Sequence, residues 1–366
     1  MTHARFTPLA ASLPATVPFV GPETQERALG RPFLARLGAN ESVFGPSPKV
    51  TEAMATEEHW KYADPENHDL RHALAAQLGC GADNIVVGEG IDGLLGYLVR
   101  LLVGPGDAVV TSAGAYPTFN YHVAGFGGTL HQVPYDDADR ESPSALFAKA
   151  AEIDAKLVYL ANPDNPMGTV WTGAEIANAM ETLPKGALLL LDEAYIECAP
   201  MGSSPDLPWD DPRLIRMRTF SKVYGMAGAR IGYAIGHAEL ILAFNKVRNH
   251  FGVNRAAQAG ALAALEDQDW LAEVTKRINA ARQQITAITT DLGLMPIPSA
   301  TNFVAIDCGR DGAFAKAILD GLIGNGIFAR MPFVAPQNRC IRVSCGPKSD
   351  LESFRDALRT VLADAD

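Results

Sequence analysis

The sequence predicts a doubly wound α/β protein in which a mainly parallel sheet covered by helices is followed by a smaller α+β domain. Between residue 48 and about residue 250, short apolar runs bounded by turn residues alternate with helical patterns. These runs are apolar throughout, as the strands of a parallel sheet buried on both faces are. Beyond residue 250 long helical patterns dominate. We therefore expect an N-terminal arm and the start of a small domain at 1–46, a large domain at 47–250 and a small C-terminal domain at 251–366.

The first 46 residues are rich in proline and glycine and lack sustained periodicity, which is typical of an arm that lies against another part of the protein. In the large domain we expect helices at 69–78 and 94–102, and strands at 85–87, 108–110, 157–160 and 187–191. In the small domain we expect helices at 256–265 and 270–292, and strands at 302–306 and 340–343. Ligands of a doubly wound sheet bind at the carboxyl ends of its strands, so the chemistry is expected there.

Composition excludes several classes of partner. The chain has 366 residues, of which 48% are hydrophobic, and its net charge is -11. No basic run interleaved with aromatic residues occurs, so nucleic acid is not an expected partner. No segment approaches the roughly 20 apolar residues of a membrane span, and Pro14 and Pro18 interrupt the apolar stretch 9–20 that a signal peptide would need.

The five cysteines form no C-x-x-C pair and are odd in number, which indicates free thiols in a reducing compartment. The histidines show no metal-ligand spacing, and His122 in particular is expected to be a surface or core residue. We expect a cytoplasmic protein that holds no metal.

The first candidate for chemistry is Leu188 to Tyr195, an apolar strand that ends in Asp192 and Glu193. Such a strand holds magnesium in nucleotide-hydrolysing enzymes, but those enzymes also need a G-x-x-x-x-G-K-[S/T] loop, which this chain lacks. In the second interpretation Asp192 faces a protonated pyridine nitrogen and keeps that ring cationic, so that the ring accepts electrons. Tyr195 could then reach a phenolic oxygen of the same ring.

The second candidate is Gly88 to Gly93, a literal G-x-G-x-x-G that follows a predicted strand and opens a helix. A dinucleotide site is one interpretation. However, the acidic residue nearest the required spacing, Asp107, lies in a turn and not at a strand end. Free backbone N–H groups and a helix dipole hold a single phosphate equally well, so this segment predicts a phosphate site.

The third candidate is Arg218 to Tyr233, in which Lys222 follows a predicted strand and a hydroxyl and precedes a glycine-rich stretch. An isolated lysine is usually a solvated surface group. Here Arg230, eight positions later, supplies a bidentate partner for a phosphate. The combination predicts a lysine that acts as a nucleophile beside a bound phosphate group.

Together these segments resemble the fold-type I aminotransferases that use pyridoxal 5'-phosphate (PLP), and among them the histidinol-phosphate aminotransferase-like group. The resemblance covers roughly residues 36 to 346. It rests on the Asp192 and Lys222 segments and on three shorter motifs: Ala39 to Pro48, Tyr62 to Pro65, and Asn162 to Gly168, which reads Asn-Pro-Asp-Asn-Pro-Met-Gly.

The resemblance implies that Lys222 holds PLP as a Schiff base and moves the proton at the substrate α-carbon. It implies that Asp192 pairs with the pyridine nitrogen and that Tyr195 and Asn165 bind the ring oxygen. Tyr116 would stack on the ring, and the phosphate would be bound by Gly90, Ile91, Asp92, Ser221, Arg230 and, across a shared homodimer interface, Tyr62. The implied substrate contacts are Arg342, which would take the α-carboxylate, and Arg330, Asn40 and Phe19.

Three departures from the group's pattern bear on the substrate: Met167 stands for the usual threonine, Gly93 for an acidic residue and Phe19 for tyrosine. Because Phe19 cannot donate a hydrogen bond, a phosphate-bearing substrate loses one contact. We therefore expect an amino acid and a 2-oxo acid as substrates, with histidinol phosphate and aromatic amino acids as candidates. Two alternatives stay open: a PLP lyase resembling threonine-phosphate decarboxylase, and a non-catalytic PLP-binding module.

Overall fold

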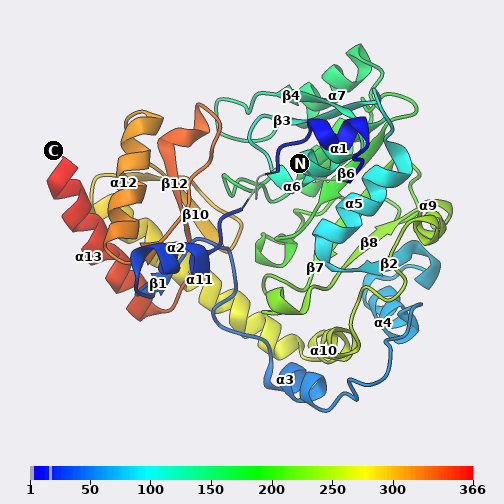
Figure 1. The fold of residues 1–366 in the computed structure, drawn as a ribbon, viewed down its shortest axis with the longest axis horizontal. Coiled ribbons are helices and arrows are strands. Elements are labelled where there is room, and N and C mark those ends of the chain that lie inside the picture. The colour runs from blue at the N-terminus through cyan, green and yellow to red at the C-terminus, as the bar shows by residue number, and fades with distance from the viewer. Residues whose placement is uncertain (1–3, 16–18, 366) are drawn as a thin grey trace.

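The computed structural model describes residues 4–15 and 19–365, and Figure 1 shows a larger and a smaller sheet, each with its own helices. Among the described residues the larger sheet has seven strands: β2 Ile85–Gly88, β3 Ala108–Ser112, β4 Thr129–Val133, β5 Leu157–Ala161, β6 Leu188–Asp192, β7 Leu214–Thr219 and β8 Gly232–Gly236. Their order is β2-β8-β7-β6-β5-β3-β4. Only β8 is antiparallel to its neighbours. The predicted α/β class with a mainly parallel sheet is confirmed.

Helices cover both faces of this sheet because its central strands are apolar throughout and buried. One face packs on α5 (Gly90–Leu102), α6 (Pro117–Gly125) and α9 (Ala238–Ala243). The other packs on α7 (Pro143–Glu152) and α8 (Gly173–Met180) and, at the β2–β8 edge, on α3 (Pro48–Ala55), α4 (His68–Leu78) and α10 (Arg255–Glu266). Short 3-10 helices lie at Ala82–Asn84, Ile196–Cys198, Ala227–Ala229, Phe244–Lys246 and Gln337–Arg339.

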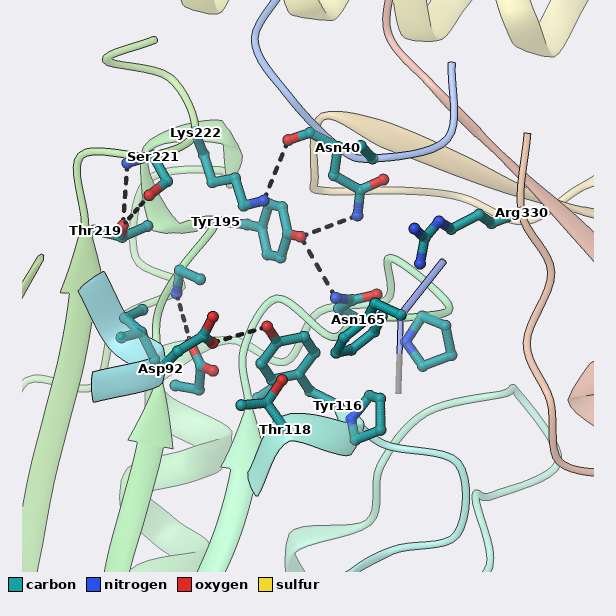
Figure 2. A pocket seen from close by; sticks show the side chains of 18 of the residues that line it. Asn40, Asp92, Tyr116, Thr118, Asn165, Tyr195, Thr219, Ser221, Lys222 and Arg330 are labelled. Carbon is teal, nitrogen blue, oxygen red and sulfur yellow. Dashed lines mark hydrogen bonds between the residues drawn. The ribbon is translucent and has the colours of Figure 1, made fainter. Parts of the chain in front are cut away.

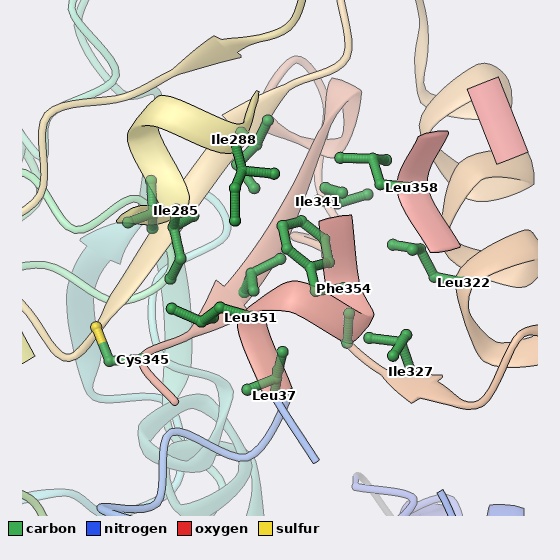
Figure 3. Close-up of a cluster of buried hydrophobic side chains, with 14 of the residues drawn as sticks. Leu37, Ile285, Ile288, Leu322, Ile327, Ile341, Cys345, Leu351, Phe354 and Leu358 are labelled. Carbon is green, nitrogen blue, oxygen red and sulfur yellow. The ribbon is translucent and has the colours of Figure 1, made fainter. Parts of the chain in front are cut away.

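The smaller sheet is antiparallel and has the order β12-β10-β9, with bounds β9 Met295–Pro296, β10 Phe303–Asp307 and β12 Cys340–Ser344. Its helices are α11 (Gln268–Asp291), α12 (Gly312–Gly324) and α13 (Lys348–Ala365). Figure 3 shows their shared core, in which Phe354 lies among Leu322, Ile341 and Leu358, all fully buried. This core is separate from those of the larger sheet.

The N-terminal segment contains α1 (Pro8–Ser12), α2 (Pro22–Leu29) and β1 (Ala35–Arg36), and β1 pairs in parallel with β11 (Ile327–Phe328). Leu37, directly after β1, is fully buried in the core of the smaller sheet, and its carbonyl oxygen accepts from the backbone N–H of Ser344 at 2.7 Å. This anchoring fixes the residues that follow, including Asn40. The boundaries at residues 46 and 250 stay a prediction.

Candidate active site

A cavity of about 620 Å³ lies where the carboxyl ends of the large sheet, the N-terminal segment and the strand β12 meet. Its walls bring together residues that are far apart in the sequence, and Figure 2 shows them from close by. The predicted site residues that line it are Phe19, Asn40, Ile91, Asp92, Tyr116, Asn165, Asp192, Tyr195, Ser221, Lys222, Arg230, Arg330 and Arg342.

Asp192 is the last residue of β6 and is buried at the floor of the cavity. Its Oδ2 accepts from the hydroxyl of Tyr159 at 2.8 Å, and its Oδ1 accepts from the backbone N–H of Ala194 at 2.9 Å. Burial raises the pKa of Asp192 to about 6, although these two hydrogen bonds favour the ionised form. A cation placed beside this carboxylate would relieve the cost of burying its charge.

Lys222 follows β7 by three residues, and its Nζ donates to the carbonyl oxygen of Asn40 at 3.2 Å. The same nitrogen lies 5.3 Å from the centre of the Tyr195 ring. Asn40 itself has a φ of +55°, a left-handed conformation that asparagine tolerates better than most residues. The lysine amine therefore sits inside the cavity, on the same side as Asn40 and Tyr195 (Figure 2).

The hydroxyl of Tyr195 accepts from two amides, Asn40 Nδ2 at 3.0 Å and Asn165 Nδ2 at 3.5 Å. Asn165 in turn accepts through Oδ1 from the guanidinium of Arg342. Burial is the main reason that the pKa of Arg342 falls to about 10. Its Nε is buried and has no hydrogen-bond partner among the described residues. An unsatisfied buried cation of this kind suits an anionic ligand.

A cradle for an anion forms where α5 begins. Gly90, the first residue of α5, has a φ of +75°, and the preceding Glu89 provides no side-chain cap. A Cβ built on Gly90 would lie 2.6 Å from NH2 of Arg230, so a side chain here would displace that guanidinium. The guanidinium of Arg230 also lies 3.5 Å from the hydroxyl of Ser221. Helix N–H groups, a hydroxyl and an arginine thus converge, as at many phosphate sites.

Aromatic rings and a second arginine form the outer wall. Tyr116 donates to Asp92 Oδ1 at 2.9 Å, and its ring stacks with Phe19 at a centroid distance of 6.3 Å. The guanidinium of Arg330 lies 5.7 Å from the Phe19 ring and donates to the carbonyl oxygen of Val20 at 2.9 Å. Arg330 also pairs through its backbone with Arg342. Neither arginine forms a salt bridge with a carboxylate in residues 4–15 and 19–365.

Comparison with known proteins agrees with this geometry. Residues 34–358 match the family described as aminotransferase class I and II. The chain belongs to that family. It is 36% identical to a histidinol-phosphate aminotransferase of Roseiflexus castenholzii over 97% of both chains. It is 35% identical to histidinol-phosphate aminotransferase 1 of Nitrosococcus oceani, over 93% of this chain and 92% of the relative.

A solved structure gives the same result. The crystal structure of histidinol-phosphate aminotransferase from Sinorhizobium meliloti in complex with pyridoxal-5'-phosphate is 54% identical to this chain. The two superpose with a TM-score of 0.96 over 100% of this chain and 99% of the other. The predictions of fold type I, of a PLP-dependent aminotransferase and of PLP as cofactor are thereby confirmed. The lyase and the non-catalytic module are not favoured.

Two of the predicted residues lie apart from the cavity wall of this aminotransferase. Gly90 lies at the start of α5, where its backbone borders the Arg230 guanidinium. Tyr62 is 82% exposed and packs on Phe251, with ring centroids 5.1 Å apart. Within one chain Tyr62 therefore has no contact with the site.

Several other residues of the cavity belong to no motif and were not predicted, among them Tyr159, Thr219, Phe333 and His122. Tyr159 lies within the otherwise apolar strand β5. Only its side-chain hydrogen bond to Asp192, at the end of β6, shows that it belongs to the site. Thr219 accepts from the backbone N–H of Ser221 at 3.0 Å and fixes the turn before Lys222. His122, expected at the surface or in the core, is half-buried and lines the cavity against Gly96 of α5.

No helix in the described part of the chain combines the length and the apolar character that crossing a membrane requires.

Proposed function

We propose that this aminotransferase takes the amino group of histidinol phosphate and passes it to a 2-oxo acid, with PLP bound around Lys222. One observation carries the choice of substrate: Arg342 and Arg330 lie side by side in the cavity wall, and Arg342 keeps a buried, unpartnered Nε. Two adjacent guanidiniums suit a doubly charged phosphate better than a single carboxylate. The relatives described above carry histidinol phosphate in their names.

The residues present fit PLP. Its phosphate would be held by the N–H groups at Gly90 to Asp92, by Ser221 and by Arg230, where a side chain at position 90 would fill the space. Its ring nitrogen would meet Asp192, whose buried carboxylate has no cation paired with it among residues 4–15 and 19–365. When bound, the cofactor supplies an electron sink for the electron pair left on the substrate α-carbon.

Proton transfer and the positioning of groups in the site depend on residues of the chain. The amine of Lys222 would hold the cofactor and would act as the base that takes the proton from the substrate α-carbon. Tyr159 and the backbone of Ala194 keep the Asp192 carboxylate in place. Asn165 donates to the Tyr195 hydroxyl next to the lysine, and these two side chains would bind the ring oxygen of the cofactor. Tyr116 closes one face of the site.

An aromatic amino acid is the second candidate substrate. Phe19, Tyr116 and Phe333 line the outer part of the cavity, and Phe19 has no hydroxyl to offer to a phosphate. These rings would pack on an imidazole or a phenyl group equally well. Only histidinol phosphate carries a phosphate group, so a requirement for that group distinguishes the two candidate substrates.

We also propose a homodimer with shared sites in a reducing, cytoplasmic environment. Trp60 and Tyr62 are 79% and 82% exposed, and Phe251, at 53%, packs on Tyr62. Large exposed aromatic residues in one patch are typical of a protein interface. All five cysteines are free thiols, which suits a reducing compartment.

The test is a half-reaction with the PLP-loaded enzyme and no 2-oxo acid. Histidinol phosphate, histidinol and phenylalanine are mixed separately with the enzyme, and loss of the cofactor's visible absorbance is followed in time. We expect histidinol phosphate to react at least about a hundredfold more efficiently than histidinol, because two arginines are left unpaired without the phosphate. Faster reaction of phenylalanine than of histidinol phosphate would reject the proposal in favour of the second candidate.

A further inference from the structure

Two buried carboxyl groups, Glu141 and Asp164, lie within hydrogen-bonding reach of each other, and Asp164 directly precedes Asn165 in the chain. Glu141 precedes α7 and is 1% exposed, and Asp164 follows β5 and is 2% exposed. Within the loop that carries Asn165, the backbone N–H of Asp164 donates to Thr169 and its carbonyl accepts from Gly168. Any displacement of Asp164 therefore moves its neighbour Asn165.

The hydrogen bonds around the pair assign a donor and an acceptor. Asp164 accepts at Oδ1 from the hydroxyl of Tyr135 at 2.9 Å and at Oδ2 from the backbone N–H of Met167 at 2.8 Å. Glu141 accepts at Oε1 from the backbone N–H of Ala161 at 2.9 Å. Its Oε2 is buried and makes no hydrogen bond with a described residue, and the buried hydroxyl of Ser112, which also lacks a partner, faces the same carboxyl group. A proton on Glu141, donated to Asp164, satisfies this oxygen.

The charges around the pair favour this arrangement. The titratable or charged groups that face the pair are Tyr135, Asp139, Tyr159 and Arg342. Asp139 is neutralised by Arg339, at 2.7 Å, and Arg342 forms no salt bridge within the described ranges. Burial raises the pKa of Glu141 well above its usual range and that of Asp164 to about 6. Two ionised carboxylates in contact here would be costly, whereas one negative charge opposes the buried Arg342 cation.

We propose that Glu141 and Asp164 are positioning residues that hold Asn165 against Arg342, and that they do so as an acid pair sharing one proton with Glu141 as the donor. The proposal rests on the role proposed above for Arg342. Asn165 Oδ1 accepts from Arg342, so the guanidinium meets the substrate anion in one orientation only while the loop stays in place. Loss of the shared proton puts a second negative charge beside Asp164 and releases that orientation.

Because Glu141 is the donor and Asp164 the acceptor, the isosteric variants Glu141→Gln and Asp164→Asn should affect the pair differently. Glu141→Gln keeps a donor toward Asp164 through its amide, and that amide cannot ionise. Asp164→Asn replaces one acceptor oxygen by an NH2 group, which then opposes the donor of Tyr135 or of Met167. Glu181→Gln, on a solvent-exposed carboxylate, is the matched control.

The test has two readouts on the PLP-loaded enzyme. The first is the KM for the active amino donor against pH. At neutral pH we expect Asp164→Asn to raise KM about tenfold with kcat changed less than about threefold, and Glu141→Gln to change both less than about threefold. As the pH rises from neutral into the alkaline range, KM should increase in the wild type and in Glu181→Gln but stay level in Glu141→Gln. Equal effects of the two variants, or an alkaline rise that Glu141→Gln keeps, would overturn the proposal.

The second readout does not depend on the substrate. The infrared spectrum at pH 8 should contain the C=O band of a protonated carboxylic acid that Glu141→Gln removes and Glu181→Gln keeps. Absence of that difference would reject the shared proton even if histidinol phosphate proves to be the substrate. Presence of the difference would support the pair even if another amino donor is found.

Discussion

The Nζ of Lys222 and the carbonyl oxygen of Asn40 lie 3.2 Å apart, which joins the edge of the large sheet to the N-terminal segment. Asn302, directly before β10 of the small sheet, donates to the same carbonyl at 3.0 Å. Asn40 also accepts from the hydroxyl of Ser344 at 2.9 Å. Three parts of the chain therefore meet at Asn40, directly beside the lysine amine.

Gly90→Ala tests the phosphate cradle. The added methyl group would lie 2.6 Å from the Arg230 guanidinium, so we expect the affinity for PLP to fall by at least about tenfold. Gly79→Ala is the matched control, because Gly79 has a similar φ of +72° and nothing within 4 Å of the added atom. The control should lose about 1 kcal/mol of stability and keep its PLP affinity. Equilibrium titration with PLP measures both variants, and equal affinities would place the phosphate elsewhere.

Arg342→Lys tests the anion site. Lysine keeps the charge but loses the planar fork, so the bond to Asn165 and the contact with a substrate anion cannot both form. We expect kcat/KM to fall by about 10²-fold while the cofactor absorbance stays unchanged. Steady-state kinetics and a visible spectrum of the same sample measure this. Wild-type kcat/KM in the variant would remove Arg342 from the substrate site.

Asp192 predicts a pH dependence of the apoprotein. Its pKa rises from 3.8 in the unfolded chain to about 6 in the fold, so the folded state binds the proton more tightly. The apoprotein therefore loses stability as the pH increases from about 4 to about 6, by roughly 2–3 kcal/mol in total. Asp192→Asn should lack this loss. Urea unfolding of the two apoproteins at several pH values compares them, and parallel curves would contradict the assignment.

Tyr62 tests the proposed dimer. If its exposed ring serves the neighbouring site, Tyr62→Phe should weaken PLP binding without changing the dimer. Leu242→Ala, at 68% exposure on α9 and outside the residues that line the cavity, provides a surface control. Sedimentation and PLP titration give the two readouts. A monomeric wild type would refute the shared site.

The sequence predicted the buried parts of the fold well because burial imposes a clear pattern. The expected strand at 187–191 is β6, Leu188–Asp192, displaced by one residue. In contrast β4, Thr129–Val133, is a partly exposed edge strand whose mixed composition gives no such signal. The expected helix at 94–102 begins four residues earlier, at Gly90, because the glycines that open it break the helical pattern.

The candidate site was predictable where a residue belongs to a motif. Lys222, Asp192 and Arg230 each stand in such a motif, and the structure brings them to one cavity. Tyr159 and Glu141 have no sequence signal, because their roles depend on which strand or loop lies next to theirs. Contacts of this kind, between segments far apart in the chain, can be read only from the fold.

Borohydride treatment of the PLP-loaded enzyme, followed by peptide mass spectrometry, tests the central claim most directly. A cofactor bound to the amine beside Asn40 and Tyr195 becomes permanently attached to Lys222, and Lys222→Ala should give an uncoloured protein with no attachment. The exposed Lys185→Ala should behave as the wild type. Attachment at a different lysine, or colour that persists in Lys222→Ala, would contradict the account.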